Sequence, residues 1–248
     1  MTSPKLTLYS CNYCPFAARA VIAMAETRQE HDKIEVDIST PRPDWYLQEI
    51  NPFGQVPSLK VDDKHIILES LIVTEYIADL HLESGLLPTD PLQRAQTSYL
   101  IQHWGSRTQA AIHKATITRD PVESAKLRQE VMMELEKVDV LLRNAVSDEN
   151  PTTSFDSEKG SFLFFLGAKF TLADLAIAPF LARFFLISAF QKEGTHEEFE
   201  KSLQENPKVQ RFLEWRDAIL QRPSLQKATP AKDVLVNVYR KFLPKESN

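Results

Sequence analysis

Two cysteines near the N-terminus carry the strongest candidate chemistry in this sequence of 248 residues. Cys11 and Cys14 stand where a strand-like segment passes into an Ala-rich helix, and Pro15 suits the first position of that helix. The N–H groups and the dipole at a helix N-terminus stabilise a thiolate. The position therefore predicts that Cys14 is a nucleophile, and Arg19, just over one turn further on, would add to the positive field.

The role of Cys11 is open to several interpretations. Cys11-x-x-Cys14 could be a redox dithiol or half of a zinc site. Zinc needs further Cys or His ligands at suitable spacing, and the sequence has no other cysteine, so we predict no metal site. In a dithiol motif at a helix start, the second cysteine usually lies a turn into the helix, where this sequence has Ala17. A monothiol nucleophile at Cys14 fits better, and a dithiol cycle is the alternative.

A second candidate site follows in the run from Asn51 to Pro57, Asn-Pro-Phe-Gly-Gln-Val-Pro. Pro57 enters a strand, where its missing N–H must face an edge, and a cis Val56–Pro57 bond would allow that. Such a turn leaves the N–H and C=O of Val56 free to pair with an extended ligand. Glu69 and Ser70 stand at a strand-to-helix turn, where a hydroxyl and helix N–H groups form an anion site. Helix capping alone is the alternative for these two residues.

Two regions of different patterning must position these motifs. Residues 1–83 alternate strand and helix signals in the order βαβ, then ββα, and from residue 90 only helix signals remain. The expected strands lie near 6–8, 34–38, 58–61 and 65–68. The expected helices lie near 17–25, 69–82, 90–114, 121–144, 207–221 and 234–242, and residues 41–50 are expected to form a loop and a short helix. Residues 147–160 are expected to form an exposed loop. Thr171 and Asp174 have capping-box spacing at the start of a further helix.

Composition excludes several classes of protein. Lys and Arg total 29 against 34 Asp and Glu, so the net charge of −5 argues against nucleic-acid binding. No apolar run reaches the ~18 residues of a membrane span, and the N-terminus has no secretory apolar region. Two cysteines provide no disulfide framework, which favours a cytoplasmic, reducing location.

These motifs together resemble those of cytosolic glutathione transferases. The resemblance is carried by Cys-Pro-Phe-Ala at 14–17, the 51–57 run and Glu-Ser at 69–70, and the Cys-Pro-Phe form is similar to the omega class. Leu-Leu-Pro at 86–88 with Asp90-Pro91, and the box at 171–174, extend the resemblance over most of the chain. It implies a thioredoxin-like domain at 1–83, an all-helical bundle at 90–248 and a homodimer.

The resemblance also implies roles for individual residues. Cys14 would bond to the glutathione sulfur, and Val56 would make antiparallel main-chain bonds to its cysteinyl part. Glu69 and Ser70 would hold the γ-glutamyl ammonium and carboxylate. Arg42 falls where the family places a lysine that meets the glycyl carboxylate. Glutathione would be a co-substrate, with no prosthetic group.

The second substrate would lie between the domains, as the resemblance implies. Its candidate contacts are Tyr99, His103, Trp104 and Arg183, although aromatic residues at helical spacing more often belong to the core. The substrate would be a hydrophobic or disulfide-containing small molecule.

The implied function is that of a glutathione-dependent thiol transferase or reductase that works through a mixed disulfide. Its substrates would be glutathione mixed disulfides, dehydroascorbate or glutathionyl ketones. A thiolate exchanges disulfides well, which favours reduction over conjugation. The alternatives are a non-catalytic protein of the same fold that binds hydrophobic ligands and, less favoured by the intact set of motif residues, an interaction domain. A turnover assay separates an enzyme from a binding protein.

Overall fold

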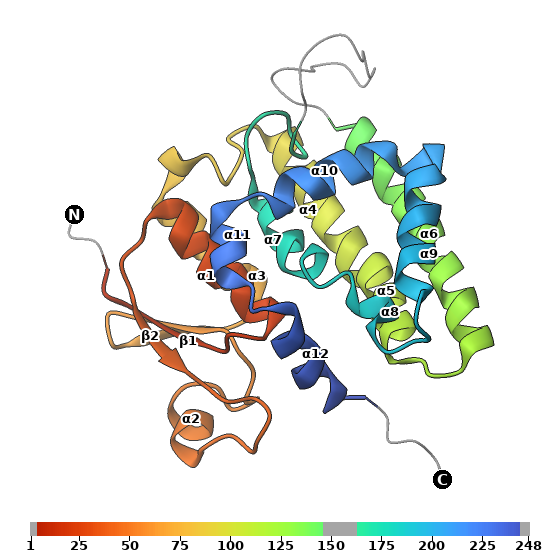
Figure 1. Cartoon of the computed structure of the whole chain (residues 1–248). Helices are drawn as coiled ribbons and strands as arrows, with labels where there is room; N and C mark the ends of the chain where they lie inside the picture. The colour runs from red at the N-terminus through yellow and green to blue at the C-terminus, as the bar shows by residue number, and fades with distance from the viewer. Residues whose placement is uncertain (1–3, 146–162, 244–248) are drawn as a thin grey trace. The chain divides into compact units, whose positions relative to one another are not determined.

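The computed structural model describes residues 4–145 and 163–243, and the expected loop at 147–160 lies outside them. The chain divides into two compact units, drawn in Figure 1. One comprises residues 1–87 with 222–230, and the other comprises 88–221 with 231–248. The short segment 222–230 thus belongs with the N-terminal unit, although it comes late in the chain.

The N-terminal unit is built on a sheet with the strand order β2-β1-β3-β4. The strands are β1 (Leu6–Ser10), β2 (Asp32–Glu35), β3 (Ser58–Val61) and β4 (His65–Ile67). β1 pairs in parallel with β2 and antiparallel with β3, and β3 pairs antiparallel with β4. The predicted order, βαβ followed by ββα, is confirmed.

Helices complete this unit, and all of those described except the last overlap a segment that the sequence predicts to contain a helix. They are α1 (Pro15–Thr27), α2 (Asp44–Glu49), α3 (Ser70–Leu80) and α11 (Pro223–Ala228), with a 3-10 turn at Leu82–Ser84. α1 packs closely because small side chains such as Ala17 and Ala20 are fully buried on it. α11 lies beside α1 (Figure 1), where Arg222 and Ser224 both donate hydrogen bonds to the carboxylate of Glu26.

The second unit is helical throughout its regular elements. They are α4 (Pro91–His103), a π-helical turn (Trp104–Thr108), α5 (Gln109–Ile117), α6 (Pro121–Arg143), α7 (Leu172–Leu181), α8 (Leu186–Ala189), α9 (Thr195–Glu205), a 3-10 turn (Pro207–Val209), α10 (Gln210–Leu220) and α12 (Lys232–Arg240). α4 and α6 each begin with an Asp-Pro pair, in which Asp90 or Asp120 accepts a hydrogen bond from an N–H of the first turn. The fold class is confirmed: an α/β unit and an all-α unit.

A buried carboxylate holds the core of the helical unit together. Asp174, with no exposed surface, accepts hydrogen bonds from the N–H and hydroxyl of Thr171, the N–H of Phe165 and the indole of Trp215, at 2.6–2.9 Å. Thr171 and Asp174 form the predicted capping box of α7. Burial raises the pKa of Asp174 against the pull of these donors. This cluster is called the Asp174 network below.

Some elements differ from the sequence prediction. The strand expected near 34–38 is β2, four residues that all lie exposed at the sheet edge. The long helix expected at 90–114 is interrupted by the π-helical turn at Trp104–Thr108. The described helices α9 and α11 lie outside the expected helical segments, and α9 buries Phe199 and Leu203, one turn apart.

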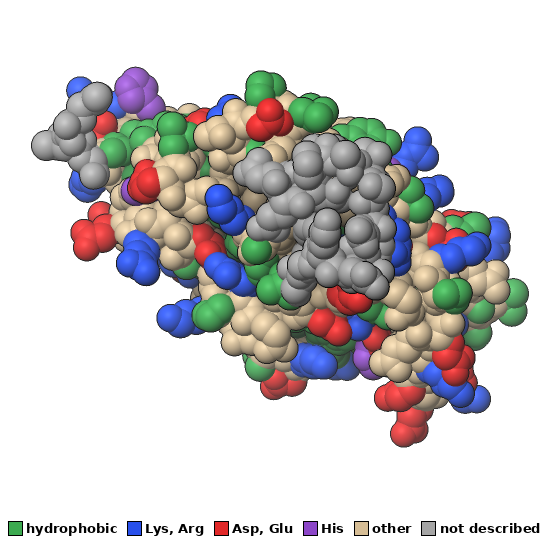
Figure 2. Space-filling model, turned by 90° about the horizontal axis from the view of Figure 1, so that it is seen from above, with side chains coloured by type: hydrophobic (Ala, Val, Ile, Leu, Met, Phe, Trp, Pro, Cys, Tyr) green, Lys and Arg blue, Asp and Glu red, His purple; other side chains and the backbone are tan. Residues whose placement is uncertain are grey.

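The surface carries charges of both signs, and the described helices can be compared with the length of a membrane span. Basic and acidic side chains are interspersed on the face shown in Figure 2 rather than grouped by sign. No helix within the described residues combines the length and apolar character needed to cross a membrane.

Candidate active site

Cys14 lies at the N-terminus of α1, where the sequence predicts its nucleophile. It is the N-cap residue, with an extended backbone (φ −78°, ψ 121°), and Pro15 occupies the first helical position. Its side chain is only 7% exposed, and the thiol donates a long hydrogen bond, 4.0 Å, to the carbonyl of Val56. The sulfur therefore faces both the positive end of the helix and the loop that contains Val56.

Arg19 brings a second positive group to this region. It is 5% exposed, and its guanidinium donates a 3.0 Å hydrogen bond to the hydroxyl of Ser70. Burial lowers the pKa of Arg19 to about 10, while the interaction with Cys14 opposes that change. Arg19 therefore keeps its charge at neutral pH and links the start of α1 to the start of α3.

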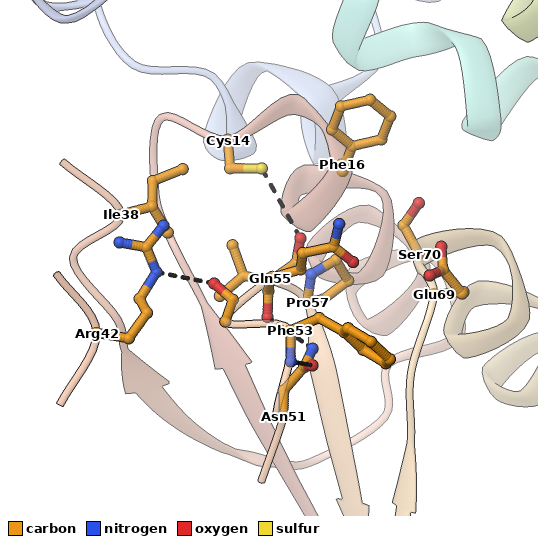
Figure 3. A pocket seen from close by; sticks show the side chains of 12 residues that line it. Cys14, Phe16, Ile38, Arg42, Asn51, Phe53, Gln55, Pro57, Glu69 and Ser70 are labelled. Carbon is orange, nitrogen blue, oxygen red and sulfur yellow. Dashed lines mark hydrogen bonds between the residues drawn. The ribbon is translucent and has the colours of Figure 1, made fainter. Parts of the chain in front are cut away.

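One pocket of about 350 Å³ brings the predicted glutathione residues together. The pocket is lined by Cys14, Phe16, Ile38, Arg42, Asn51, Phe53, Gly54, Gln55, Val56, Pro57, Glu69 and Ser70. In the view of Figure 3, the segment 55–57 lies between Arg42 on one side and Glu69 with Ser70 on the other, with Cys14 above it. The five glutathione-site residues predicted from sequence thus line the same cavity.

The Val56–Pro57 bond is cis, as predicted. Val56 is 8% exposed and lines the pocket. Among the described residues, none accepts a hydrogen bond from the Val56 N–H. The main-chain donor that the sequence analysis singles out is therefore available to a ligand.

Glu69 and Ser70 form the start of α3. Glu69 is exposed and has φ 69° and ψ 122°, a conformation that costs of order 1–3 kcal/mol in a residue other than glycine. Ser70 is 8% exposed and is the first residue of the helix, where backbone N–H groups attract an anion. A carboxylate acceptor and an anion site thus lie next to each other at the same end of the pocket.

Arg42 donates most of its guanidinium hydrogen bonds to backbone carbonyls of the protein. Its Nε donates to the Gly54 carbonyl at 2.8 Å, and its Nη1 donates to the carbonyls of Asp37 and Thr40. Gly54 has φ +65°, and a Cβ there would lie 3.0 Å from the Arg42 Cγ, so the turn requires glycine. Arg42 therefore lines the pocket and also ties together two loops that border it.

Cys11 lies in a different environment from Cys14. It is 2% exposed, and burial raises the pKa of its thiol, with Tyr13 hydrogen-bonded to it. The Tyr13 hydroxyl donates to Asp37 at 2.9 Å and accepts the Ile38 N–H at 3.2 Å. Burial raises the pKa of Tyr13 to about 12. Cys11 thus belongs to the packing between the first turn and the 37–38 loop, and Cys11 is not among the residues that line the pocket.

The four predicted acceptor contacts all lie in the helical unit. Trp104 has no exposed surface and packs edge-on against Trp215. Arg183 follows the end of α7, is 4% exposed and donates a 2.8 Å hydrogen bond to the carbonyl of Pro179 in the last turn of that helix. His103 is half-buried, 3.4 Å from Glu134, and burial lowers its pKa. Tyr99 is 60% exposed. None of the four lines the pocket around Cys14.

Three buried polar residues near the pocket have no role in the sequence analysis. Tyr46, Asn51 and Ser58 are joined by hydrogen bonds to one another and to the Gln55 carbonyl. The only available sequence signal is that Asn51 opens the 51–57 run. Among the described residues, no group of three or more His, Cys, Asp or Glu is arranged to hold a metal ion.

Comparison with known proteins agrees with this geometry. A family model described as Glutathione S-transferase, N-terminal domain, matches residues 8–85, and one described as Glutathione S-transferase, C-terminal domain, matches residues 121–215. Glutathione S-transferase omega-1 of Mus musculus is 27% identical over 135 residues, which cover 54% of this chain and 55% of that protein. The chain therefore spans about half the length of this curated relative.

Longer matches extend over most of the chain. Protein IN2-1 homolog A of Oryza sativa subsp. japonica is 30% identical over 218 residues, which cover 85% of this chain and 79% of that protein. The crystal structure of glutathione transferase Omega 1C from Trametes versicolor superposes with a TM-score of 0.78 at 27% identity, covering 97% of each chain. The chain belongs to the glutathione S-transferase family, and its similarity is to the omega class.

Proposed function

We propose that this protein is a glutathione-dependent thiol transferase or reductase whose nucleophile is Cys14. The observation that carries the proposal is the shared pocket: the Cys14 sulfur at a helix N-terminus opens onto the same cavity as Val56, Glu69 and Ser70. A glutathione molecule has a thiol flanked by a peptide and two charged ends, and the cavity offers a matching group for each part.

The order of groups along the pocket supports one orientation for glutathione. The γ-glutamyl ammonium pairs with the Glu69 carboxylate, and the γ-glutamyl carboxylate meets the Ser70 hydroxyl and the N-terminus of α3. The cysteinyl backbone pairs with Val56, which places the sulfur of glutathione next to Cys14. The glycyl carboxylate then points toward Arg42, whose charge is shared between the ligand and the loop carbonyls.

The proposed reaction is two successive thiol–disulfide exchanges. The Cys14 thiolate attacks the glutathionyl sulfur of a mixed disulfide, a Cys14–glutathione disulfide forms, and the substrate leaves as a thiolate that takes up a proton. The thiolate of a second glutathione then attacks the glutathionyl sulfur, which releases oxidised glutathione and restores Cys14. Dehydroascorbate and glutathionyl ketones are further acceptors in the proposal. Dehydroascorbate takes up two electrons and two protons as two glutathiones become oxidised glutathione. A glutathionyl ketone instead gives its own glutathionyl sulfur to Cys14, the carbon left behind takes up a proton to give the free ketone, and one free glutathione then releases oxidised glutathione and restores Cys14.

We also propose a cytoplasmic location and a homodimer. Two free cysteines suit a reducing compartment. The homodimer follows from the family resemblance, and sedimentation of the purified chain tests it.

Substitution of the nucleophile tests the proposed chemistry. Cys14→Ala should reduce deglutathionylation of a peptide mixed disulfide to background while calorimetry still detects glutathione binding, because no charge that anchors glutathione is lost. Cys11→Ala, which removes the other thiol, serves as the matched control and should keep turnover. Full turnover by Cys14→Ala would overturn the mechanism, and a wild-type chain that binds hydrophobic ligands without turnover would favour the binding-protein alternative.

A further inference from the structure

A closed ring of hydrogen bonds lies against the 55–58 segment. Tyr46 donates its hydroxyl hydrogen to the Gln55 carbonyl at 2.6 Å, and Asn51 donates from Nδ2 to the same oxygen at 3.0 Å. Ser58 Oγ lies 3.0 Å from the Tyr46 hydroxyl and 3.2 Å from Asn51 Nδ2. These four groups are called the loop network.

The hydrogens of the loop network can be assigned uniquely. Tyr46 has one hydroxyl hydrogen, which goes to Gln55, so at Ser58 the tyrosine oxygen must accept. The Ser58 hydroxyl therefore donates to Tyr46 and accepts the second hydrogen of Asn51 Nδ2. Each side-chain hydrogen is used once, and both lone pairs of the Gln55 carbonyl are occupied. A chain of donors in one direction strengthens each of its members.

Burial makes the loop network rigid. Tyr46 and Ser58 have no exposed surface, and Asn51 is 2% exposed. The backbone around it is tied in the same way: the N–H of Asn51 donates to the Tyr46 carbonyl at 2.8 Å, and the N–H of Phe53 donates to Asn51 Oδ1 at 3.0 Å. Burial also raises the pKa of Tyr46, so its hydroxyl remains a donor at neutral pH.

The Gln55 carbonyl shares its peptide unit with the Val56 N–H. That peptide is trans, so its C=O and N–H point in opposite directions within one plane. A carbonyl held by Tyr46 and Asn51 therefore fixes the direction of the Val56 N–H. No acceptor for this N–H is found among the described residues.

We propose that Tyr46, Asn51 and Ser58 are positioning residues for glutathione recognition. By holding the Gln55 carbonyl on the protein side of the peptide plane, they present the Val56 N–H to the cysteinyl carbonyl of glutathione. The inference rests on the proposed function and adds three side chains to it, of which Tyr46 and Ser58 do not line the pocket. They act through the Val56 peptide and not by touching the reacting sulfur.

Removal of one hydroxyl from the loop network tests the inference. Tyr46→Phe should raise the Kd and the KM for glutathione by roughly 3- to 10-fold, the range for one neutral hydrogen bond. Its kcat at saturating glutathione, and the rate at which iodoacetamide alkylates Cys14, should stay within about twofold of wild type, because the sulfur and the α1 terminus are untouched. A general loss of structure would not separate KM from kcat in this way.

Tyr9→Phe is the matched control. Tyr9 is 5% exposed, and its ring packs 5.8 Å from that of Tyr46, but no hydrogen bond joins its hydroxyl to the described residues 55–58. Tyr9→Phe should bind glutathione as wild type does. Ser58→Ala, which opens the ring at another point, should weaken binding in the same direction and decides the question if Tyr46→Phe does not fold.

The outcomes distinguish this inference from the proposed function. If wild type itself binds no glutathione, the proposed function fails. If wild type binds glutathione and Tyr46→Phe binds it as tightly as Tyr9→Phe does, the positioning role is overturned. Equal losses of affinity, kcat and alkylation rate in Tyr46→Phe would also overturn it, because they would indicate general disruption of the fold.

Discussion

The loop network and the Asp174 network are both buried and rich in hydrogen bonds, but they differ in whether they hold a peptide with an N–H that is unpaired in the part of the chain that the structure describes. The donors of Phe165, Thr171 and Trp215 all end on the Asp174 carboxylate, which has no exposed surface. The loop network also satisfies its own side chains, but the Gln55 carbonyl that it holds shares a peptide with Val56, whose N–H has no acceptor among the described residues and in our proposal binds glutathione. The difference indicates that one cluster stabilises a fold and the other orients a donor.

The two networks should therefore respond differently to substitution. A change in the Asp174 network should alter the free energy of unfolding with little effect on the Cys14 pocket, since the two clusters belong to different compact units. A change at the pocket should alter glutathione affinity with a smaller effect on stability.

Asp174→Ala should have the largest effect, a loss of about 3 kcal/mol or more in the free energy of unfolding. The substitution leaves the N–H of Phe165 and the indole N–H of Trp215 buried without an acceptor, and each such donor costs roughly 1–3 kcal/mol. Urea unfolding followed by circular dichroism measures the loss, with exposed Asp217→Ala as the control. A variant as stable as the control would show that these hydrogen bonds do not hold the unit together.

Glu69→Ala should weaken glutathione binding by roughly 10- to 150-fold. A charge-assisted hydrogen bond of this kind is worth about 1.5–3 kcal/mol, and Glu69 would be the partner of the γ-glutamyl ammonium. Isothermal calorimetry gives the affinity, and Glu75→Ala, an exposed carboxylate on the same helix, is the control. If Glu69→Ala bound glutathione with wild-type affinity, the proposed position of the glutathione site would be wrong, even if Cys14 still reacted as proposed.

Thr171→Ala should lower the free energy of unfolding by about 1 kcal/mol, the usual cost of losing a helix cap. Thr171→Ser keeps the hydroxyl and should lie closer to wild type. Thiol transfer should be unchanged in both variants when they are assayed well below their melting temperatures. A folded Thr171→Ala variant that kept its melting temperature but lost turnover would contradict the claim that the Asp174 network affects stability and not the Cys14 pocket.

Cys11→Ala should have the smallest effect, with thiol-transfer rates within about threefold of wild type. Cys11 precedes the helix, and burial raises the pKa of its thiol, so it contributes little thiolate. Steady-state turnover with a peptide mixed disulfide measures the change. A fall of two orders of magnitude would establish a dithiol cycle in place of the monothiol mechanism.

Local signals in the sequence were enough to predict most of the fold. Pro15, the Asp-Pro pairs and the 171–174 box each mark a helix start through backbone chemistry that acts over three or four residues. The π-helical turn at Trp104–Thr108 has no such signal, because its residues suit an α-helix equally well. The edge strand β2 lies at Asp32–Glu35 because its position is set by pairing with β1. The alternation of its own side chains does not set it.

The same distinction applies to the site. Cys14, Val56, Glu69 and Ser70 stand in contiguous motifs and were predicted from the sequence. Tyr46 was not, because its role depends on a hydrogen bond to Gln55, nine residues away across a turn. Periodicity and composition do not encode which buried hydroxyl meets which carbonyl. Such residues can be identified only from the three-dimensional structure of the loop.

In the proposed mechanism, Cys14 alone exchanges with glutathione. Incubation of the reduced protein with oxidised glutathione, followed by intact-mass measurement and peptide mapping, tests it most directly. The monothiol mechanism predicts one glutathionyl adduct for each chain, on the peptide that contains Cys14, present in Cys11→Ala and absent in Cys14→Ala. An adduct on Cys11, or a Cys11–Cys14 disulfide with no adduct retained, would contradict it.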